Sequence, residues 1–553
     1  MNSFWILLLG IIWYVLIYFV YGKILDKRII NPHNSRKTPA HRLKDGVDYV
    51  PSPTPVLFGH HFSSIAGAGP IVGPILAYAL FGWGAALLWI LLGTAFIGIT
   101  HDYFSLMTSV RNDGVSITEI SEKTISPTAK WMFSIFVWLS LVLIIAVFAV
   151  ITAKTLESKP EIAVPTLGLI VLAILFGLVV YRLKWKLIPS TIIAWIILFF
   201  LVDLGYKYPI VASYNTWFYV FLIYSFIASS IPVWLLLQPR DYLSMTILFA
   251  GLFIGYLGMF ILHPHINGPV HTTFISNGTP LVPMLFVIIA CGAISGFHSL
   301  VASGTTAKQL DKEKHGRIIG VGGMISEGVL ALLVLMLVAS ALFWKNAPSG
   351  LGDFVFQNLM KKGPIVTFGN GFGRAASSLG IPLNIGIAFG ILMLNAFVLT
   401  TLDTAVRLSR FVFQEALVKK NKILSNRWIA GFIGVFFAYI LAATKSWNVI
   451  WPIFGSANQL IAALSLFTVT AYFVGYKKPK LYSFIPAIFM WIVTEAALLY
   501  LLFFNYIKGF GKNLGDSILS SVAIILVILG GIVGIEAIRA INKKDKIFNS
   551  KEQ

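Results

Sequence analysis

The chain has 553 residues, of which 57% are hydrophobic and 12% are charged, and its mean hydropathy is +0.84. A water-soluble protein of this length needs far more polar surface, and the single cysteine excludes an intrachain disulfide and a thiolate metal cluster. The net charge of +20 could indicate a nucleic-acid partner, but Lys and Arg lie in short loops between apolar runs, which is typical of membrane proteins, so no nucleic acid is expected.

Apolar runs that are long enough to cross a bilayer recur along the whole chain and predict about fifteen transmembrane helices. Strands of a β-barrel alternate apolar and polar residues over shorter segments, so the predicted fold class is an all-α polytopic membrane protein. We place the spans at 4–24, 61–81, 83–108, 129–153, 162–181, 187–206, 215–237, 243–262, 281–303, 317–343, 380–406, 428–443, 447–474, 483–506 and 516–540.

The charges of the loops predict the orientation. With the N-terminus outside, the segments assigned to the cytoplasm carry 32 of the 42 Lys and Arg residues. This imbalance is the positive-inside pattern, and it favours an odd number of spans. We therefore expect an N-out, C-in protein of the cytoplasmic membrane, in contact with the lipid bilayer, and leave its oligomeric state open.

The second span contains a predicted break. Residues 63–74 include Gly67, Gly69, Pro70, Gly73 and Pro74, which a continuous helix does not accommodate. Broken helices survive in a bilayer only where they are buried or line a cavity, and in transporters they mark the substrate site. The alternative is that these glycines and prolines serve packing and kinks.

A second predicted break lies at Ala228–Val233 in the seventh span, where a simple kink is an equal alternative. Ile294–Thr306 in the ninth span, which is rich in hydroxyls and glycines, and Trp451–Gln459 in the thirteenth are further candidates. Spans 2 and 7 are five apart and run in opposite directions, which predicts a five-plus-five inverted repeat over spans 2–11, with discontinuous helices. The predicted organisation is an N-terminal helix with a basic loop (1–60), a transport core (61–411) and accessory C-terminal helices (412–553).

Polar side chains within the spans are further candidates, because a charge in lipid is costly and usually has a partner or a role. The candidates for ion or proton coupling are His298, Ser299, Ser303 and Thr305 in the ninth span, followed by Asp102, Glu327 and Asp403. Structural roles are the alternatives: Asp403 can pair with Arg407 four residues later, and Glu327 can hold a proton between helices.

Other polar residues receive more ordinary interpretations. His101 and Asp102 are adjacent, and neighbouring helix residues point about 100° apart, so a direct pair is not expected. His60 and His61 are expected at the membrane interface. Asn458 and Gln459 are expected to hydrogen-bond to a neighbouring helix. Three histidines within 263–271 have no nearby Asp, Glu or Cys, so no metal site is predicted.

Four segments resemble the carbon starvation protein A family: Pro51–Pro74, Leu235–Ser244, Ala290–His298 and Gly304–Thr306. The likeness runs from about residue 11 to residue 475. The resemblance implies uptake of peptides or pyruvate across the inner membrane when carbon is short, driven by protons. It also implies kinship with the amino acid–polyamine–organocation superfamily, whose core is an inverted repeat.

The resulting prediction is a proton-coupled symporter in which a carboxylate substrate, pyruvate or a peptide, lies beside the unwound backbone. Freed amides and a half-helix N-terminus favour a carboxylate there. The predicted substrate-binding residues are Ser63, Ser64, Ala66, Gly67, Gly69 and Gly73, with Ser229 and Ser230 on the opposite wall.

Other function classes fit the sequence less well. A sodium-coupled transporter of organic acids or amino acids is the main alternative, and a channel is a further one, although no ring-forming filter motif occurs. The sequence contains no H-E-x-x-H or G-x-S-x-G motif, so an enzyme is not expected. No cofactor is predicted beyond the coupling ion, H⁺ or, alternatively, Na⁺.

Overall fold

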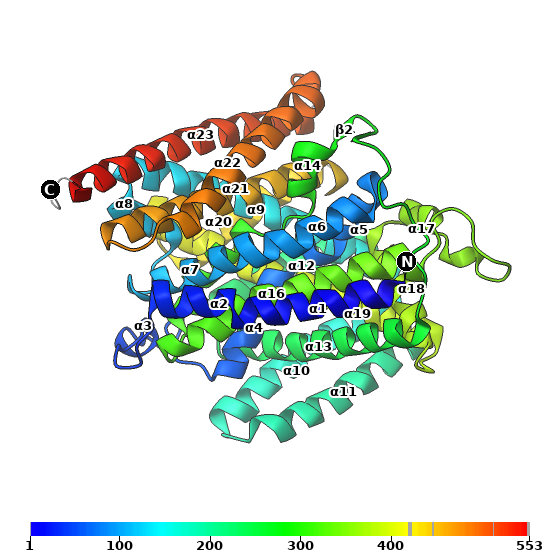
Figure 1. Ribbon diagram of the computed structural model, residues 1–553. Helices are drawn as coiled ribbons and strands as arrows, with labels where there is room; N and C mark the ends of the chain where they lie inside the picture. The colour runs from blue at the N-terminus through cyan, green and yellow to red at the C-terminus, as the bar shows by residue number, and fades with distance from the viewer. Residues whose placement is uncertain (1, 418–422, 445–446, 513, 550–553) are drawn as a thin grey trace.

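The computed structural model describes residues 2–417, 423–444, 447–512 and 514–549, and these residues form a helical bundle with one short hairpin, β1 (Ile275–Ser276) and β2 (Thr279–Pro280) (Figure 1). Four basic residues that were counted for the orientation lie outside the described residues: Lys419, Lys420, Lys422 and Lys551. The orientation and the total of fifteen spans stay predictions.

The elements before the hairpin are α1 (Ser3–Phe19), α2 (Tyr21–Ile24), η1 (Leu25–Ile30), α3 (Pro39–Arg42), α4 (Thr54–Ala66), α5 (Gly69–Phe81), α6 (Trp83–Leu92), η2 (Gly93–Gly98), α7 (Ile99–Val110), α8 (Ile117–Thr124), α9 (Pro127–Ser158), η3 (Pro160–Ile162), α10 (Ala163–Gly177), η4 (Leu178–Arg182), α11 (Leu187–Lys207), α12 (Tyr214–Ser230) and α13 (Leu237–Leu262). Those after it are α14 (Leu281–Ile288), α15 (Gly296–Gly304), η5 (Thr306–Lys308), η6 (Glu313–His315), α16 (Gly316–Met336), η7 (Leu337–Ala341), η8 (Gly352–Phe354), α17 (Phe356–Lys362), α18 (Pro364–Ser377), α19 (Leu383–Val412), η9 (Phe413–Leu417), α20 (Arg427–Thr444), α21 (Trp447–Gly475), α22 (Leu481–Leu501), η10 (Leu502–Tyr506), η11 (Ile507–Gly509) and α23 (Leu514–Asn549).

Local sequence signals place the helix ends. The N-terminus of α9 shows this clearly, because the Ser126 side chain accepts a hydrogen bond from the Ala129 amide at 3.0 Å and Pro127 occupies the first helical turn. The helix then runs for 32 residues, about 48 Å at the usual rise per residue. It is therefore longer than the hydrocarbon core of about 30 Å and can cross it with a tilt.

Twelve helical segments among the described residues are long and apolar enough to cross a membrane. Three predicted spans are not among these twelve. Span 215–237 contains the 17-residue α12, span 428–443 contains the short α20, and span 281–303 divides into α14 and α15.

The two predicted breaks have different outcomes. The first is confirmed but is narrower than 63–74, since only Gly67 and Ala68 separate α4 from α5. The second is wrong: α12 ends at Ser230, and residues 231–236 connect it to α13, so the non-helical stretch lies between two helices. The ninth span is interrupted as the sequence suggests, but at Ile289–Ser295, between α14 and α15, and most of the candidate stretch 294–306 is the helix α15.

Two halves of the bundle repeat the same order of elements. The broken helix α4/α5 is followed by α6–η2–α7, the short α8 and the long α9, and the broken helix α14/α15 is followed by α16–η7, the short α17 and α18, and the long α19. Further contacts match: α12 packs on α9 as α20 packs on α19, and α13 packs on α4 as α21 packs on α15. The second half thus begins at α14 and not at the seventh span.

The remaining helices lie around this core. Figure 1 shows α10 and α11 together at one edge of the bundle and α22 and α23 at the opposite edge. The hairpin α10–α11 falls within the first half of the repeat, and within the described residues the second half has no equivalent of it. The domain boundaries at residues 60 and 411 stay predictions, although α21 lies beyond residue 411 and packs against α15.

Candidate transport site at the two interrupted helices

The first break depends on the backbone of Gly67. This residue has φ +47° and ψ −149°, a conformation that favours glycine. A Cβ added at Gly67 would lie 2.9 Å from Thr401 Oγ1, so space excludes a side chain as well. The Thr401 hydroxyl donates to the Ser64 carbonyl at 3.1 Å, and it thereby satisfies a backbone group in the last turn of α4.

The second break is held by α21. The Asn458 side chain accepts a hydrogen bond from the Phe297 amide at 2.8 Å and donates to Ser295 Oγ at 2.8 Å, at the N-terminus of α15. Gln459 donates to the Phe286 carbonyl near the end of α14 at 2.9 Å. The expectation that these two amides bind a neighbouring helix is confirmed, and their partners are groups at the ends of a broken helix.

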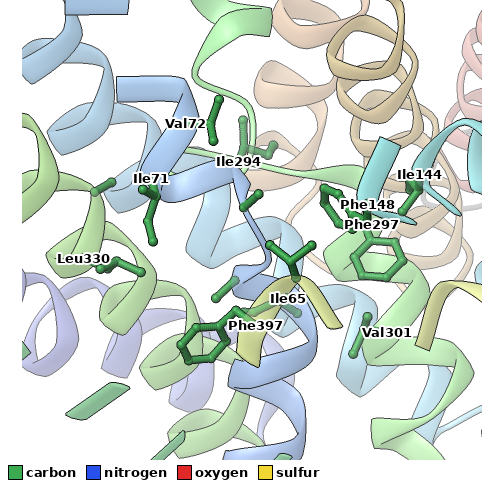
Figure 2. Close-up of a cluster of buried hydrophobic side chains, with 14 of the residues drawn as sticks. Ile65, Ile71, Val72, Ile144, Phe148, Ile294, Phe297, Val301, Leu330 and Phe397 are labelled. Atoms are coloured by element: carbon green, nitrogen blue, oxygen red, sulfur yellow. The ribbon is translucent and has the colours of Figure 1, made fainter. Parts of the chain in front are cut away.

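The two breaks lie against each other. A Cβ added at Gly73 would lie 2.7 Å from the Ile288 carbonyl, and one at Gly69 would overlap Cys291. Figure 2 shows apolar side chains around this crossing, among them Phe148 and Phe297. These side chains are buried, so the two breaks are shielded from solvent in this conformation.

A buried imidazole lies between two carboxylates beside the second break. His298 in α15 is hydrogen-bonded through Nδ1 to Asp102 Oδ2 at 3.0 Å, and its Nε2 lies 3.1 Å from Glu327 Oε2. Asp102 comes from α7 and Glu327 from α16, and all three side chains are fully buried. The structure therefore brings together three coupling candidates that are far apart in the sequence, in a group that can take up or release a proton.

Two further histidines border this group, and both differ from the expectations. His101 Nδ1 lies 2.9 Å from Asp102 Oδ1, so the adjacent residues do pair, because side-chain rotation brings the ring back to its neighbour. His61 is fully buried and bonds to Thr306 Oγ1 at 2.9 Å, and His60 is also fully buried. Interfacial placement of His60 and His61 is therefore wrong.

A second buried network surrounds Arg240. This residue donates to Asp403, to Asp241 at 2.9 Å and to the Tyr224 hydroxyl at 2.7 Å. Asp241 in turn lies 2.6 Å from Nδ1 of His60. The sequence does not predict this network, because Arg240 follows an apolar run and is one of the 32 basic residues assigned to the cytoplasmic side.

The predicted pair of Asp403 and Arg407 is wrong. Asp403 pairs with Arg240, while Arg407 lies 2.8 Å from Asp48 and donates to the carbonyls of Ala228 and Ile231. These two carbonyls lie at the C-terminal end of α12, where helical backbone groups lack intrahelical partners. Arg407 thus caps a helix end.

The hydroxyl side chains predicted to bind substrate near the first break, or an ion in α15, form hydrogen bonds within the bundle. Ser63 donates to the Asp241 carbonyl at 2.8 Å, and Ser64 lies 3.2 Å from Thr404 Oγ1. In α15, Ser299 bonds to Ser465 at 2.7 Å. The remaining two also have partners: Ser303 accepts from the Ile117 amide at 3.1 Å, and Thr305 bonds to His60 at 3.2 Å.

Ser229 and Ser230 lie away from the first break. Both donate to the Phe226 carbonyl within the last turn of α12, the helix end that Arg407 caps. Thr401, which faces Gly67, and Arg407 both lie on α19. They are six residues apart, which corresponds to about 9 Å along the helix. These two serines could line a substrate site opposite Gly67 only if α12 moved. Their role in substrate binding stays a prediction.

One group of side chains has the composition of a metal site. Cys291, His298 and Glu327 each offer a ligand atom, and these atoms lie within 4.8 Å of one another. His298 bonds to Asp102 through Nδ1, while its Nε2 atom faces Glu327, so two of the three residues also belong to the buried group described above. The expectation that no metal is bound stays a prediction.

A sequence model described as "Carbon starvation protein CstA" matches residues 2–352 and 353–497 of the chain. The chain belongs to this family. Members of the CstA family that resemble it are named as transporters, so it is an integral membrane transporter and not an enzyme.

Curated relatives match most of the chain. "Peptide transporter CstA" of Escherichia coli is 32% identical over 90% of this chain and 80% of the relative. "Pyruvate/proton symporter BtsT" of the same organism is 31% identical over 90% and 81%. "Peptide transporter CstA" of Mycobacterium tuberculosis is 31% identical over 88% and 73%.

Solved structures support the fold of this CstA-family member. A manganese transporter of Eremococcus coleocola, solved in complex with an aromatic bis-isothiourea compound, aligns with a TM-score of 0.55 and 12% identity over 91% of this chain and 99% of that chain. A point mutant of the same transporter aligns with a TM-score of 0.53 and 10% identity over the same shares of the two chains. At these identities the likeness concerns the architecture alone.

Proposed function

We propose that the protein is a symporter that imports pyruvate or short peptides together with protons, in cells that are short of carbon. The observation that carries the proposal is His298, which lies 3.0 Å from one carboxylate and 3.1 Å from another and is fully buried within the helical bundle. The names of the relatives, peptide transporter and pyruvate/proton symporter, supply the substrate classes.

The proton site is coupled to the break through α15. With both carboxylates charged and His298 protonated, the group of Asp102, His298 and Glu327 carries one net negative charge, so uptake of one more proton neutralises it. Protonation of Glu327 weakens its attraction for His298, which links α16 to α15. Because α15 begins at the second break, its movement alters the neighbouring backbone at Gly69 and Cys291.

The substrate carboxylate is proposed to bind backbone amides at Gly67–Gly69, where α5 begins. Unpaired amides at a helix N-terminus attract anions. The side chains of Ser63 and Ser64 already have partners in α13 and α19, so in this conformation the glycine backbone offers the freer donors. Ala66 and Gly73 would shape the site, the former at the end of α4 and the latter against Ile288.

Transport assays on reconstituted protein test the proposal. Proteoliposomes are given labelled pyruvate or a labelled dipeptide, with the pH gradient and the sodium gradient imposed separately. We expect saturable uptake that an acidic exterior drives and that sodium does not stimulate. Uptake driven by sodium alone would establish the alternative coupling ion, and flux that never saturates would indicate a channel.

A further inference from the structure

A second cavity lies apart from the two breaks, on the face predicted to be cytoplasmic. Its volume is about 690 Å³. Four parts of the chain line it: η1 with the loop and α3 that follow, the end of α7, Glu313 at the start of η6, and the end of α21 with its connection to α22. Pockets for small ligands occupy about 300–1,000 Å³. The cavity is therefore large enough for a small bound molecule.

The lining of this cavity is strongly basic. Seven Lys and Arg side chains line it, against a single carboxylate, that of Glu313. Glu313 accepts a hydrogen bond from the His33 amide at 3.1 Å and lies 3.5 Å from Arg111 and 3.9 Å from Arg36. Arg42 also pairs with Asp113, which lies outside the lining. These two carboxylates still leave an excess of positive charge around the cavity.

Two of these cations are held in place by backbone carbonyls. Arg111 donates to the Ile30 carbonyl at 2.8 Å, and Lys478 donates to the carbonyls of Ile29 and Ile30. The Nε atom of Arg111 is buried and has no hydrogen-bond partner among the described residues. Burial, together with the nearby charges of Arg111 and Arg36, lowers the pKa of Lys478 to about 8.

The basic residues of this cavity differ from those of ordinary cytoplasmic loops. Cytoplasmic loops of membrane proteins are rich in Lys and Arg, and most such side chains are solvated. Lys312 and Lys314, on the loop that carries Glu313, are exposed and do not line the cavity. In contrast, Arg111 and Lys478 are partly buried and line one hollow, where their repulsion has a cost unless an anion is present.

We propose that this cavity binds a phosphate-bearing anion, supplied either by a soluble phosphate compound or by the headgroup of an anionic lipid. Guanidinium groups match phosphate oxygens in a bidentate manner, and lysines add point charges. The side chains of Tyr472 and Tyr476 also line the cavity and offer hydroxyl donors.

The position of the cavity connects it to transport. Arg111 follows Asp102 by nine residues along α7, about 13 Å of helix. Glu313 precedes α16, which carries Glu327, and Lys478 follows α21, which carries Asn458. A bound anion would tie together the ends of three helices that hold the proton network and the second break.

Binding measurements on the purified full-length protein test this site. The protein is placed in nanodiscs of zwitterionic lipid, and inorganic pyrophosphate is titrated by calorimetry. In a second arm, phosphatidylglycerol is added and its retention is measured by native mass spectrometry. The pocket variants are Arg111→Gln with Lys478→Gln and, to avoid any loss of folding, the exposed pair Arg36→Gln with Lys37→Gln. The matched control is Lys312→Gln with Lys314→Gln, which removes the same charge outside the cavity.

We expect both pocket variants to weaken binding by about tenfold or more, and the control to remain within about twofold of the unaltered protein. Pyrophosphate binding that the pocket variants weaken supports a soluble ligand, and lipid retention that they weaken supports a headgroup. The proposal is overturned if the unaltered protein binds neither probe, or if the control variant loses as much affinity as the pocket variants. Because these are binding measurements, they are independent of the proposed transport activity.

Discussion

The buried charged side chains of the core form two groups, and we propose a different role for each. Arg240 lies against Asp241 and Asp403, so a cation is placed among the anions of that network. In the other group, His298 is the bridge between the carboxylates of Asp102 and Glu327, and an added proton removes an unfavourable charge. We assign proton coupling to the His298 group and a structural role to the Arg240 network.

Replacement of Glu327 separates coupling from substrate binding. In Glu327→Gln the side chain keeps its size but cannot ionise. We expect uptake driven by a pH gradient to fall at least about 100-fold, the scale of a lost proton-transfer group. Exchange of labelled for unlabelled substrate across the membrane, which needs no net proton movement, should persist.

Glu495 provides the matched control for this experiment. It is another carboxyl within a membrane helix, α22, and it lies near Gly530 of α23, outside the group formed by Asp102, His298 and Glu327. Glu495→Gln should retain gradient-driven uptake. If Glu495→Gln and Glu327→Gln lose uptake equally, the effect reflects general damage to the fold and the coupling role is not supported.

Removal of Arg240 tests the structural network. Arg240→Met leaves Asp241 and Asp403 without their shared cation, and breaking a buried pair in this way costs about 3–5 kcal/mol. Asp403→Asn leaves Arg240 paired with Asp241 and should cost less, about 1–2 kcal/mol. Thermal unfolding of the detergent-solubilised protein, followed by intrinsic fluorescence, compares the two. Equal loss of thermal stability in both variants would contradict this account of Arg240.

At the scale of helices, the sequence locates a break accurately only where the residues that interrupt the helix lie in the break itself. Gly67, Gly69 and Pro70 interrupt the helix by their own backbone preferences, so the first break is visible in the sequence. The second, at Ile289–Ser295, contains no proline and one glycine, Gly292. It is held open by tertiary contacts, such as the Asn458 side chain and the bond from Thr94 to the Gly292 carbonyl at 3.1 Å.

The individual residues of the site can be predicted from the sequence, but their arrangement in one group cannot. Asp102, His298 and Glu327 each stand out as ionisable groups in apolar runs, which is a strong signal in a membrane protein. Their convergence depends on the packing of α7, α15 and α16, which the local sequence does not encode. Arg240 was misassigned for a related reason, because its burial depends on contacts with Asp403 and Tyr224, which lie in other helices.

Substitution of Gly67 tests whether the first break is required. Gly67→Leu introduces a side chain where a Cβ already approaches Thr401 and Phe148, in a backbone conformation that disfavours it. We expect uptake to be abolished while the protein still inserts into the membrane, as measured by its amount in washed membranes. Gly350→Leu is the control, since that glycine also has a positive φ of +81° but has nothing within 4 Å. Full transport by Gly67→Leu would remove the break from the mechanism.

For the whole molecule, the matching order of elements in its two halves suggests how the shielded site opens. The broken helices α4/α5 and α14/α15 touch where Gly73 meets Ile288, and most other helices pack around this crossing. In a fold of two related halves, alternating access arises when one group of helices rocks against the other around the central site. The buried state of Phe148 and Phe297 corresponds to a closed step of such a cycle.

Cys291 reports on this opening without any engineered label, because it is the only cysteine in the chain and it lies within the second break, beside Gly69 of the first. A buried thiol reacts with a membrane-permeable maleimide only when the surrounding helices separate. We expect slow labelling by intact-mass spectrometry, and a labelling rate that saturating pyruvate or dipeptide lowers at least about threefold, since bound substrate covers the thiol and favours the closed state. The substrate that protects Cys291 identifies the ligand class, and Cys291→Ala, which should remain unlabelled, confirms the position of the adduct. Rapid labelling that neither substrate changes would show that the crossing of the two broken helices is not the transport site.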